Sequence, residues 1–122
     1  MQAVNWFEIP VKDLDRAQRF YESVLSRSLR REVMDGQPLA VFPYDEPHAG
    51  GCLQADANAP AMNGQGVLIY LDCSPSIDAT LGRIEKAGGE VVEAKTALPG
   101  DMGFYARVRD TEGNVVGLHA LA

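Results

Sequence analysis

Residues 4–25, VNWFEIPVKDLDRAQRFYESVL, decide the fold of this chain. Their first part, residues 4–11, is rich in apolar and β-prone side chains and predicts a strand that ends near Pro10. Asp13 is a candidate helix N-cap, because a short acidic side chain can accept a backbone N–H of the first turn. After it, apolar residues return at the spacing of one helical face: Leu14, Ala17, Phe20, Tyr21, Val24 and Leu25. The stretch therefore predicts a strand followed directly by an amphipathic helix.

Three further strands are predicted in the first half of the chain. Residues 31–34 and 39–42 flank Asp35-Gly36, a dipeptide that supplies the positive φ angles of a tight hairpin turn. Residues 51–55 predict one more strand after a polar loop. Residues 57–66 are polar, contain Gly and Pro, and predict a connection between two halves.

The second half repeats this order of elements. Residues 67–73 predict a strand, and Ser74-Pro75 fits the N-cap and first position of a helix. The buried face of this helix is predicted to carry Ile77, Leu81 and Ile84. Gly88-Gly89 is expected to end it. Three strands follow at residues 91–94, 104–108 and 115–119, the last two joined by a turn at residues 110–114.

The two halves also match residue by residue. Five positions of the first half correspond to five of the second: Trp6, Val11, Leu14, Asp15 and Ala17 to Leu68, Cys73, Ile77, Asp78 and Ala79. The spacing differs by one residue, which the loop before the second helix absorbs. Chance similarity is the alternative to an internal duplication. As a duplication, the pattern predicts an α+β fold of two tandem βαβββ modules in a single domain, residues 1–122. Module one covers residues 1–56, the connection residues 57–66, and module two residues 67–122.

The composition of the chain excludes several classes of partner. The 122 residues include 17 acidic and 11 basic side chains, a formal net charge of −6. Nucleic acid and an anionic membrane surface are not expected as partners, because both need a basic face. The longest apolar run, residues 67–71, is too short to span a membrane. The first residues show no secretory signal pattern, and Cys52 and Cys73 form no disulfide framework. We therefore expect a cytoplasmic protein with two free thiols.

Three stretches of the sequence resemble a known superfamily. Residues 8–17 with Phe20-Tyr21 and Val24-Leu25 resemble the opening of vicinal-oxygen-chelate proteins, the relatives of glyoxalase I, bleomycin-resistance proteins and extradiol dioxygenases. Residues 87–91 resemble the end of their second helix, and residues 110–117 their closing turn and last strand. The resemblance implies two βαβββ modules that form a curled mixed sheet around a cleft, usually in a homodimer. We therefore expect a homodimer.

The resemblance also implies where a metal would be bound. Members with metal chemistry carry His, Glu or Gln near the start of each module's first strand and on its last strand. In this chain, the corresponding positions are Trp6, Leu68, Gly117 and a residue among 52–54. The first three have no side chain that can ligate a metal, so we expect no metal and no other cofactor. An alignment shifted by one or two residues would instead bring in Glu8 and His119.

Glu8 and Tyr70 are the first pair of candidate site residues. Strand alternation puts Glu8 on the face of Trp6 and Tyr70 on the face of Leu68, and the duplication places Glu8 opposite Tyr70. Glu8 is the best candidate for a catalytic base, as a buried carboxylate with a raised pKa, or else pairs with a cation at the mouth of the cleft. Tyr70 either orients a polar ligand or is a core aromatic.

Each of the other candidate residues has either a role in the site or a purely structural role. Trp6 is either a stacking wall for a planar ligand or a core residue. One of Phe104 and Tyr105 must face inward, by alternation. Cys52 is either a reactive thiol or a buried one. His119 is either an acid/base group or a histidine at the surface or an interface.

Three functions are compatible with this pattern. The first is a metal-free protein that binds a small organic molecule in an apolar cleft, with a preference for neutral or cationic ligands because the chain is acidic. The alternative is an enzyme of the same superfamily. It would be either metal-independent, abstracting a proton next to a carbonyl with Glu8, or a metal-dependent lyase, isomerase or dioxygenase. Whether the modules pair within one chain or between two chains stays open. The residues expected to line the ligand site are Trp6, Glu8, Cys52, Leu68, Tyr70, Phe104, Gly117 and His119.

Overall fold

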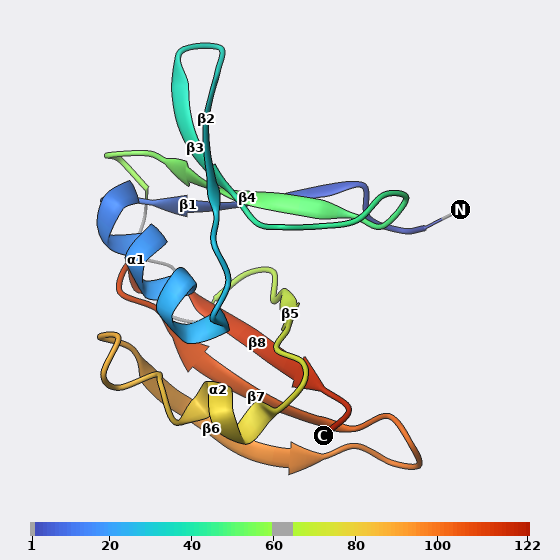
Figure 1. The fold of residues 1–122 in the computed structure, drawn as a ribbon. Helices are drawn as coiled ribbons and strands as arrows, with labels where there is room; N and C mark the ends of the chain where they lie inside the picture. Colours follow the sequence, from blue (N-terminus) through green and yellow to red (C-terminus); the bar gives the residue numbers. More distant parts are fainter. Residues whose placement is uncertain (1, 60–64) are drawn as a thin grey trace.

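A computed structural model describes residues 2–59 and 65–122 and contains two open, mixed sheets (Figure 1). The first sheet has the order β1–β4–β3–β2, with β1 at Trp6–Val11, β2 at Arg30–Met34, β3 at Gln37–Val41 and β4 at Gly50–Ala55. The second has the order β5–β8–β7–β6, with β5 at Tyr70–Asp72, β6 at Glu90–Ala97, β7 at Phe104–Arg109 and β8 at Val115–Ala120. In each sheet the first strand of the module pairs in parallel with its last strand. The predicted α+β fold of two βαβββ modules is confirmed.

The helix of the first module, α1 at Leu14–Leu25, forms as its sequence predicts. Its buried residues are the six apolar residues of the predicted face. Asp13 caps the N-terminus by accepting the Arg16 backbone N–H at 3.0 Å. Ser26 ends the helix in the left-handed conformation.

The hairpin of β2 and β3 is also a local consequence of the sequence. Asp35 and Gly36 adopt φ angles of 52° and 77°, so both turn residues lie in the left-handed region. The hairpin projects away from the rest of the molecule (Figure 1), and the side chains of β2 are exposed. β4 begins at Gly50, one residue before the predicted start.

The second module departs from the prediction in its first strand and its helix. β5 has only the three residues Tyr70–Asp72, so Leu68 precedes the strand instead of belonging to it. The helix α2, Ile77–Leu81, is capped by Ser76, whose side chain accepts the Ala79 N–H. The prediction of Ser74 as the cap was wrong, because the Ser74 hydroxyl donates to Asp72 at 2.6 Å in the preceding turn. After Leu81 the chain continues in turns as far as Gly88.

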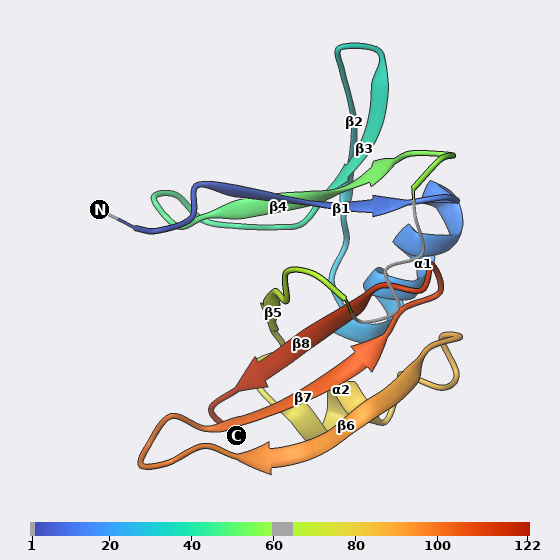
Figure 2. The same ribbon diagram turned by 180° about the vertical axis from the view of Figure 1, so that it is seen from behind.

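The main hydrophobic core contains residues of both modules. It combines one face of each sheet with the buried faces of α1 and α2. The two views in Figures 1 and 2 show α1 between the sheets and α2 against the second sheet. The other face of each sheet is therefore turned away from the core.

None of the helices in the described residues is long and apolar enough to cross a membrane.

The turn between β7 and β8 fastens the second module to α1. The Glu112 carboxylate accepts the backbone N–H groups of Lys12 and Asp13 at 3.1 and 3.0 Å, and it pairs with Arg16 at 2.6 and 2.8 Å. Burial disfavours the charged carboxylate, but the Arg16 guanidinium and the backbone donors outweigh this effect and lower the pKa of Glu112 to about 2. Glu112 thus satisfies donors at the start of a helix that belongs to the other module.

A buried hydrogen-bonded group lies beside this ion pair. The Tyr21 hydroxyl donates to Asp110 Oδ2 at 2.7 Å, and the Asn114 backbone N–H donates to Asp110 Oδ1 at 2.9 Å. Asn114 Nδ2 also donates to the Pro10 carbonyl oxygen at 3.0 Å. Burial raises the pKa of Asp110, against the effect of these hydrogen bonds. The group joins α1, β1 and the closing turn of module two in the interior.

Candidate functional site

The last-strand position at which the family resemblance expects a metal ligand is covered by an aromatic ring. Gly117 on β8 pairs in register with Tyr70 on β5. The Tyr70 ring lies over Gly117, so that a Cβ atom at position 117 would collide with its Cδ1 and Cε1 atoms. A glutamate at position 117 would therefore require the ring to move. The Tyr70 ring occupies the space that a metal-ligating side chain at position 117 would need.

Tyr70 belongs to a cluster of four hydrogen-bonded side chains on this face of the second sheet. Arg107 donates to the Tyr70 hydroxyl oxygen from Nε at 3.2 Å and from Nη2 at 2.9 Å. Its Nη1 pairs with Glu93 at 3.2 Å, and the Tyr105 hydroxyl donates to the same carboxylate at 2.8 Å. We name this group, Tyr70, Glu93, Tyr105 and Arg107, the Tyr70 cluster. Three strands contribute to it because their pairing puts these residues on one face: Tyr70 and Arg107 both pair in register with Gly117, and Glu93 pairs with Arg107.

Both tyrosine rings of the cluster lie next to the Arg107 guanidinium. The Tyr70 and Tyr105 rings are nearly perpendicular, with centroids 6.1 Å apart. The Arg107 guanidinium lies 6.0 Å from the first centroid and 5.6 Å from the second, within the range of a cation–π contact. The hydrogen bond to Glu93 raises the pKa of Tyr105. The cluster is therefore a preformed surface of two aromatic rings with a fixed pattern of donors.

The face of the first sheet that points away from the main core carries other expected residues, and Leu39, Val41 and Cys52 form a small second buried cluster on it. Trp6 is 39% exposed and makes an edge-to-face contact with Tyr44, with ring centroids 5.9 Å apart. Cys52 pairs in register with Glu8, which settles the last-strand position of module one. Cys52 is fully buried, and burial together with the Glu8 charge raises the pKa of its thiol. Its burial favours the alternative of a buried thiol at Cys52.

Glu8 is not the buried carboxylate that the sequence predicts. It is exposed, because it lies on the face of β1 that points away from the core. None of the ion pairs formed within residues 2–59 and 65–122 involves it, so the alternative of a carboxylate paired with a cation at the mouth of the cleft stays a prediction. The expected approach of Glu8 to Tyr70 does not occur within one chain, because the core lies against the opposite face of each sheet.

The remaining predicted residues lie around the Tyr70 cluster or behind it. Leu68 lines a hollow of about 280 Å³ next to Arg107. His119 lies on the same face as Tyr105, and its Nε2 donates to the Met102 carbonyl oxygen at 2.7 Å. Tyr105, and not Phe104, belongs to the exposed face. Phe104 is partly buried and packs against the main core, so the structure does not bring it together with Tyr70.

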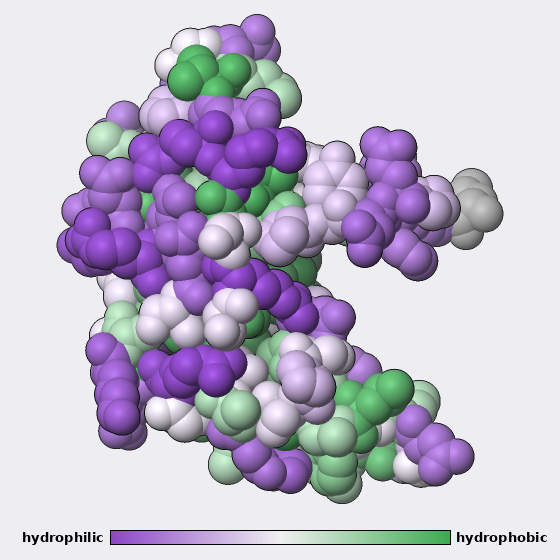
Figure 3. Space-filling model, in the orientation of Figure 1, coloured by the Kyte–Doolittle hydropathy of each residue, from purple (hydrophilic) through white to green (hydrophobic). Residues whose placement is uncertain are grey.

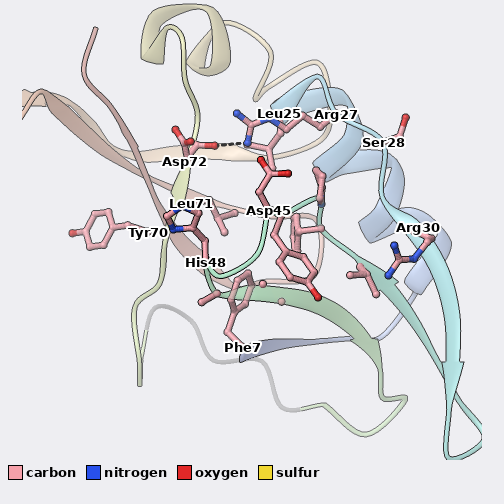
Figure 4. A pocket seen from close by; sticks show the side chains of 17 residues that line it. Phe7, Leu25, Arg27, Ser28, Arg30, Asp45, His48, Tyr70, Leu71 and Asp72 are labelled. Atoms are coloured by element: carbon pink, nitrogen blue, oxygen red, sulfur yellow. Dashed lines mark hydrogen bonds between the residues drawn. The ribbon is translucent and has the colours of Figure 1, made fainter. Parts of the chain in front are cut away.

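A larger cleft lies between the two modules, with a volume of about 970 Å³, and is visible as a hollow in Figure 3. Phe7, Phe42 and Leu71 contribute apolar surface, and the loop at residues 43–49 adds polar groups. Arg27 donates to the carbonyl oxygen of Asp72 at 2.8 Å, as Figure 4 shows. Of the residues expected from the sequence to bind a ligand, only Tyr70 borders this cleft, and its ring points away from it (Figure 4).

The donors near the expected metal position do not fit a divalent cation. In the part of the chain that the structure describes, no three His, Cys, Asp or Glu side chains come together in a group that could hold a metal ion. Trp6 and Leu68 offer no donor atom that suits a cation, and Gly117 offers no side chain. Structural zinc sites use four protein donors, and catalytic zinc sites use three.

Sequence reasoning missed Arg107 and Glu93, which hold the two tyrosines of the cluster. Alternation along β7 puts Arg107 on the same face as Tyr105, and this signal was available in the sequence. Glu93 could not be found in the same way. Two irregularities in the pairing of β6 with β7, between Val91 and Glu93 and between Glu93 and Thr96, change its register.

The paired modules, each with a parallel pairing of its first and last strands, define the class of protein. The chain belongs to the Glyoxalase/Bleomycin resistance protein/Dioxygenase superfamily, whose family model matches residues 3–118. The chain has no significant match among curated protein sequences.

Solved structures show the same fold. The hypothetical protein SA1046 from S. aureus is 20% identical, with a TM-score of 0.70 over 98% of this chain and 95% of its own. TnmS3, an antibiotic binding protein from Streptomyces sp. CB03234, is 23% identical, with a TM-score of 0.69 over 98% of this chain and 96% of its own. A V278E mutant of glyoxalase I from Zea mays is 20% identical, with a TM-score of 0.74 over 96% of this chain and 45% of its own.

Proposed function

We propose that the protein binds a small aromatic organic molecule on the exposed face of its second sheet, without a divalent cation. The observation that carries this proposal is the Tyr70 ring over Gly117, because an aromatic surface replaces a carboxylate at the family's metal position. A ring that is open to solvent on one side offers a stacking surface for a planar ligand. Tyr70 is 43% exposed. The antibiotic binding protein TnmS3 has the same fold, which supports a proposal of binding for this chain.

We also propose that the site is completed in a homodimer. Large apolar side chains are exposed on both sheets, among them Trp6 and Val33 on the first and Tyr70 on the second. Trp6 adjoins the exposed ring of Tyr44, and contiguous exposed apolar surface is typical of an interaction site. In such a dimer, the Trp6 face of one copy lies against the Tyr70 face of the other. Each chain forms a single domain in this proposal, because both modules contribute to one main core. Sedimentation equilibrium should give twice the chain mass, and a monomer at micromolar concentration would contradict this part of the proposal.

Two buried, unpaired cysteines, Cys52 and Cys73, support a cytoplasmic protein. The alternative function, an enzyme that uses Glu8 as a base, is not favoured by a specific observation. A general base needs a substrate held next to it, and Glu8 stands exposed on a face that Tyr70 does not share.

A binding screen with matched variants tests the proposal. Aromatic compounds are screened by ligand-observed NMR against the wild-type chain, Tyr70→Ala and the control Glu85→Ala, which changes an exposed residue in the turns after α2, each with chelator and with added Ni²⁺, Zn²⁺ or Mn²⁺. We expect binders that lose affinity in Tyr70→Ala, keep it in Glu85→Ala and do not depend on the ion. The proposal fails if no aromatic compound binds, if Tyr70→Ala binds like the wild type, or if binding requires a metal ion.

A further inference from the structure

Two aromatic rings form an exposed corner on the first sheet, apart from the Tyr70 cluster. The Trp6 and Tyr44 rings are nearly perpendicular, at 81°, with centroids 5.9 Å apart. A Cβ atom at Gly50, the register partner of Trp6, would collide with the Tyr44 ring, so this ring lies on the same face of the sheet as Trp6. Trp6 is 39% exposed and Tyr44 is 41% exposed. Two perpendicular aromatic walls therefore meet at the surface, and solvent reaches both.

A carboxylate without a countercharge lies beside this corner. Glu8 follows Trp6 by two residues on β1, so strand alternation puts both side chains on one face, and Glu8 is exposed. Both groups act on the Cys52 thiol. Burial raises the pKa of this thiol most, the Glu8 charge raises it further, and a hydrogen bond from the Trp6 side chain opposes both. Within residues 2–59 and 65–122, Glu8 forms no ion pair, so its charge is available to a ligand next to the rings.

The charges around the corner favour a cation. Arg30 on β2 shares this face of the sheet, but its Nε is bound to the Glu32 carboxylate at 2.8 Å. Asp45 and Glu46 follow Tyr44 in the chain and add two more carboxylates to the same loop. The whole chain carries a formal charge of −6. An anion would therefore approach against the local and the overall charge, whereas a cation is attracted by both.

We propose that Trp6, Tyr44 and Glu8 form a second ligand site, the Trp6 site, which takes the quaternary ammonium group of a small organic molecule. The faces of aromatic rings attract a cation within about 6 Å of the ring centroid, and tryptophan does so most strongly. Ring faces accept no strong hydrogen bonds, so they suit an ammonium that is fully methylated better than one that carries N–H donors. Glu8 supplies the opposite charge. The Trp6 site goes beyond the proposed function, because its residues lie on the other sheet from the Tyr70 cluster and belong to a single chain.

Two probes of the same shape isolate the effect of the charge. Choline and the neutral alcohol 3,3-dimethylbutan-1-ol differ only in that carbon replaces the nitrogen, and Kd is measured for each by ligand-observed NMR. A cation–π contact at an exposed site corresponds to a preference of about fivefold for choline in the wild-type chain. Trp6→Leu keeps an apolar side chain and should abolish the preference, and Glu8→Gln should weaken choline binding by about twofold. Glu85→Gln changes an exposed carboxylate in the turns after α2 and is the control that should keep the preference.

Several outcomes would overturn the Trp6 site. It is overturned if choline does not bind, if choline and the neutral alcohol bind with equal affinity, or if Trp6→Leu keeps the preference. Equal effects of Glu8→Gln and Glu85→Gln would remove Glu8 from it. Tighter binding of ethanolamine than of choline would overturn the quaternary ammonium class, and co-sedimentation with phosphatidylcholine vesicles without binding of free choline would assign the site to a lipid headgroup instead of a small molecule. None of these results bears on aromatic binding at Tyr70, and thermal denaturation verifies that each variant folds.

Discussion

The ion pair between Glu112 and Arg16 leads to a sharp prediction about stability. Replacing Glu112 with Gln removes the charge that lies against the guanidinium and the start of α1. The pKa of Glu112 falls from 4.5 to about 2 in the folded chain, which corresponds to roughly 3 kcal/mol if it is fully realised. Arg16 is 47% exposed, so solvent screening reduces this value, and we expect about 2 kcal/mol at pH 7. The melting temperature should fall by about 8 °C.

The pH dependence of this effect identifies its cause. The folded pKa is lower than the unfolded one, so the stabilisation is fully present above about pH 5 and is lost as the pH falls toward 2. Urea unfolding at pH 7 and pH 3 should therefore show that the difference between wild type and Glu112→Gln shrinks by more than half at pH 3. Glu85→Gln changes an exposed carboxylate and should stay within about 0.5 kcal/mol of the wild type at both pH values. An equal loss for Glu112→Gln at both pH values would refute the electrostatic argument.

Three other predictions follow from the described residues. Tyr21→Phe should lower the free energy of unfolding by about 2 kcal/mol, because it removes a hydrogen bond to the buried Asp110, whereas Tyr44→Phe in urea unfolding should cost far less. Cys52 and Cys73 should react with a thiol reagent only at the rate of unfolding, because both are buried and burial raises the pKa of each; rapid labelling of the native protein would contradict their placement. Ni²⁺, Zn²⁺, Co²⁺, Mn²⁺ and Fe²⁺ should leave the melting temperature unchanged in a thermal-shift series, and a rise of several degrees with one ion would point to a metal site.

Local patterns account for the parts of the fold that were predicted well. The α1 helix follows from the spacing of its apolar face and from Asp13, and the β2–β3 turn follows from Asp35-Gly36. In each case the residues that decide the structure lie within one or two turns of each other. The second helix was predicted less well, because Ser74 and Ser76 are both good caps. The choice between them depends on the contact of Ser74 with Asp72 in the preceding turn.

The candidate site was predicted only in part. Tyr70 was predicted from strand alternation and the duplication, and Gly117 from the family resemblance; the structure shows that they are register partners. Their relation to Arg107 and Glu93 depends on the pairing of β7 with β6, whose register shifts at two places. The exposure of Glu8 depends on which face of β1 the core occupies, and a strand pattern alone cannot decide that.

The sequence by itself determined the order of the elements, the internal duplication, the family and the lack of metal-ligating side chains at three of the four family positions. These properties follow from the identity of single residues and from short-range periodicity. Only the tertiary structure decided that Glu112 and Asp110 fasten module two to α1, and that Glu8 and Tyr70 lie on faces turned away from a common core. The physical reason is that burial and long-range pairing depend on how two modules share one core, which no local stretch of the chain encodes.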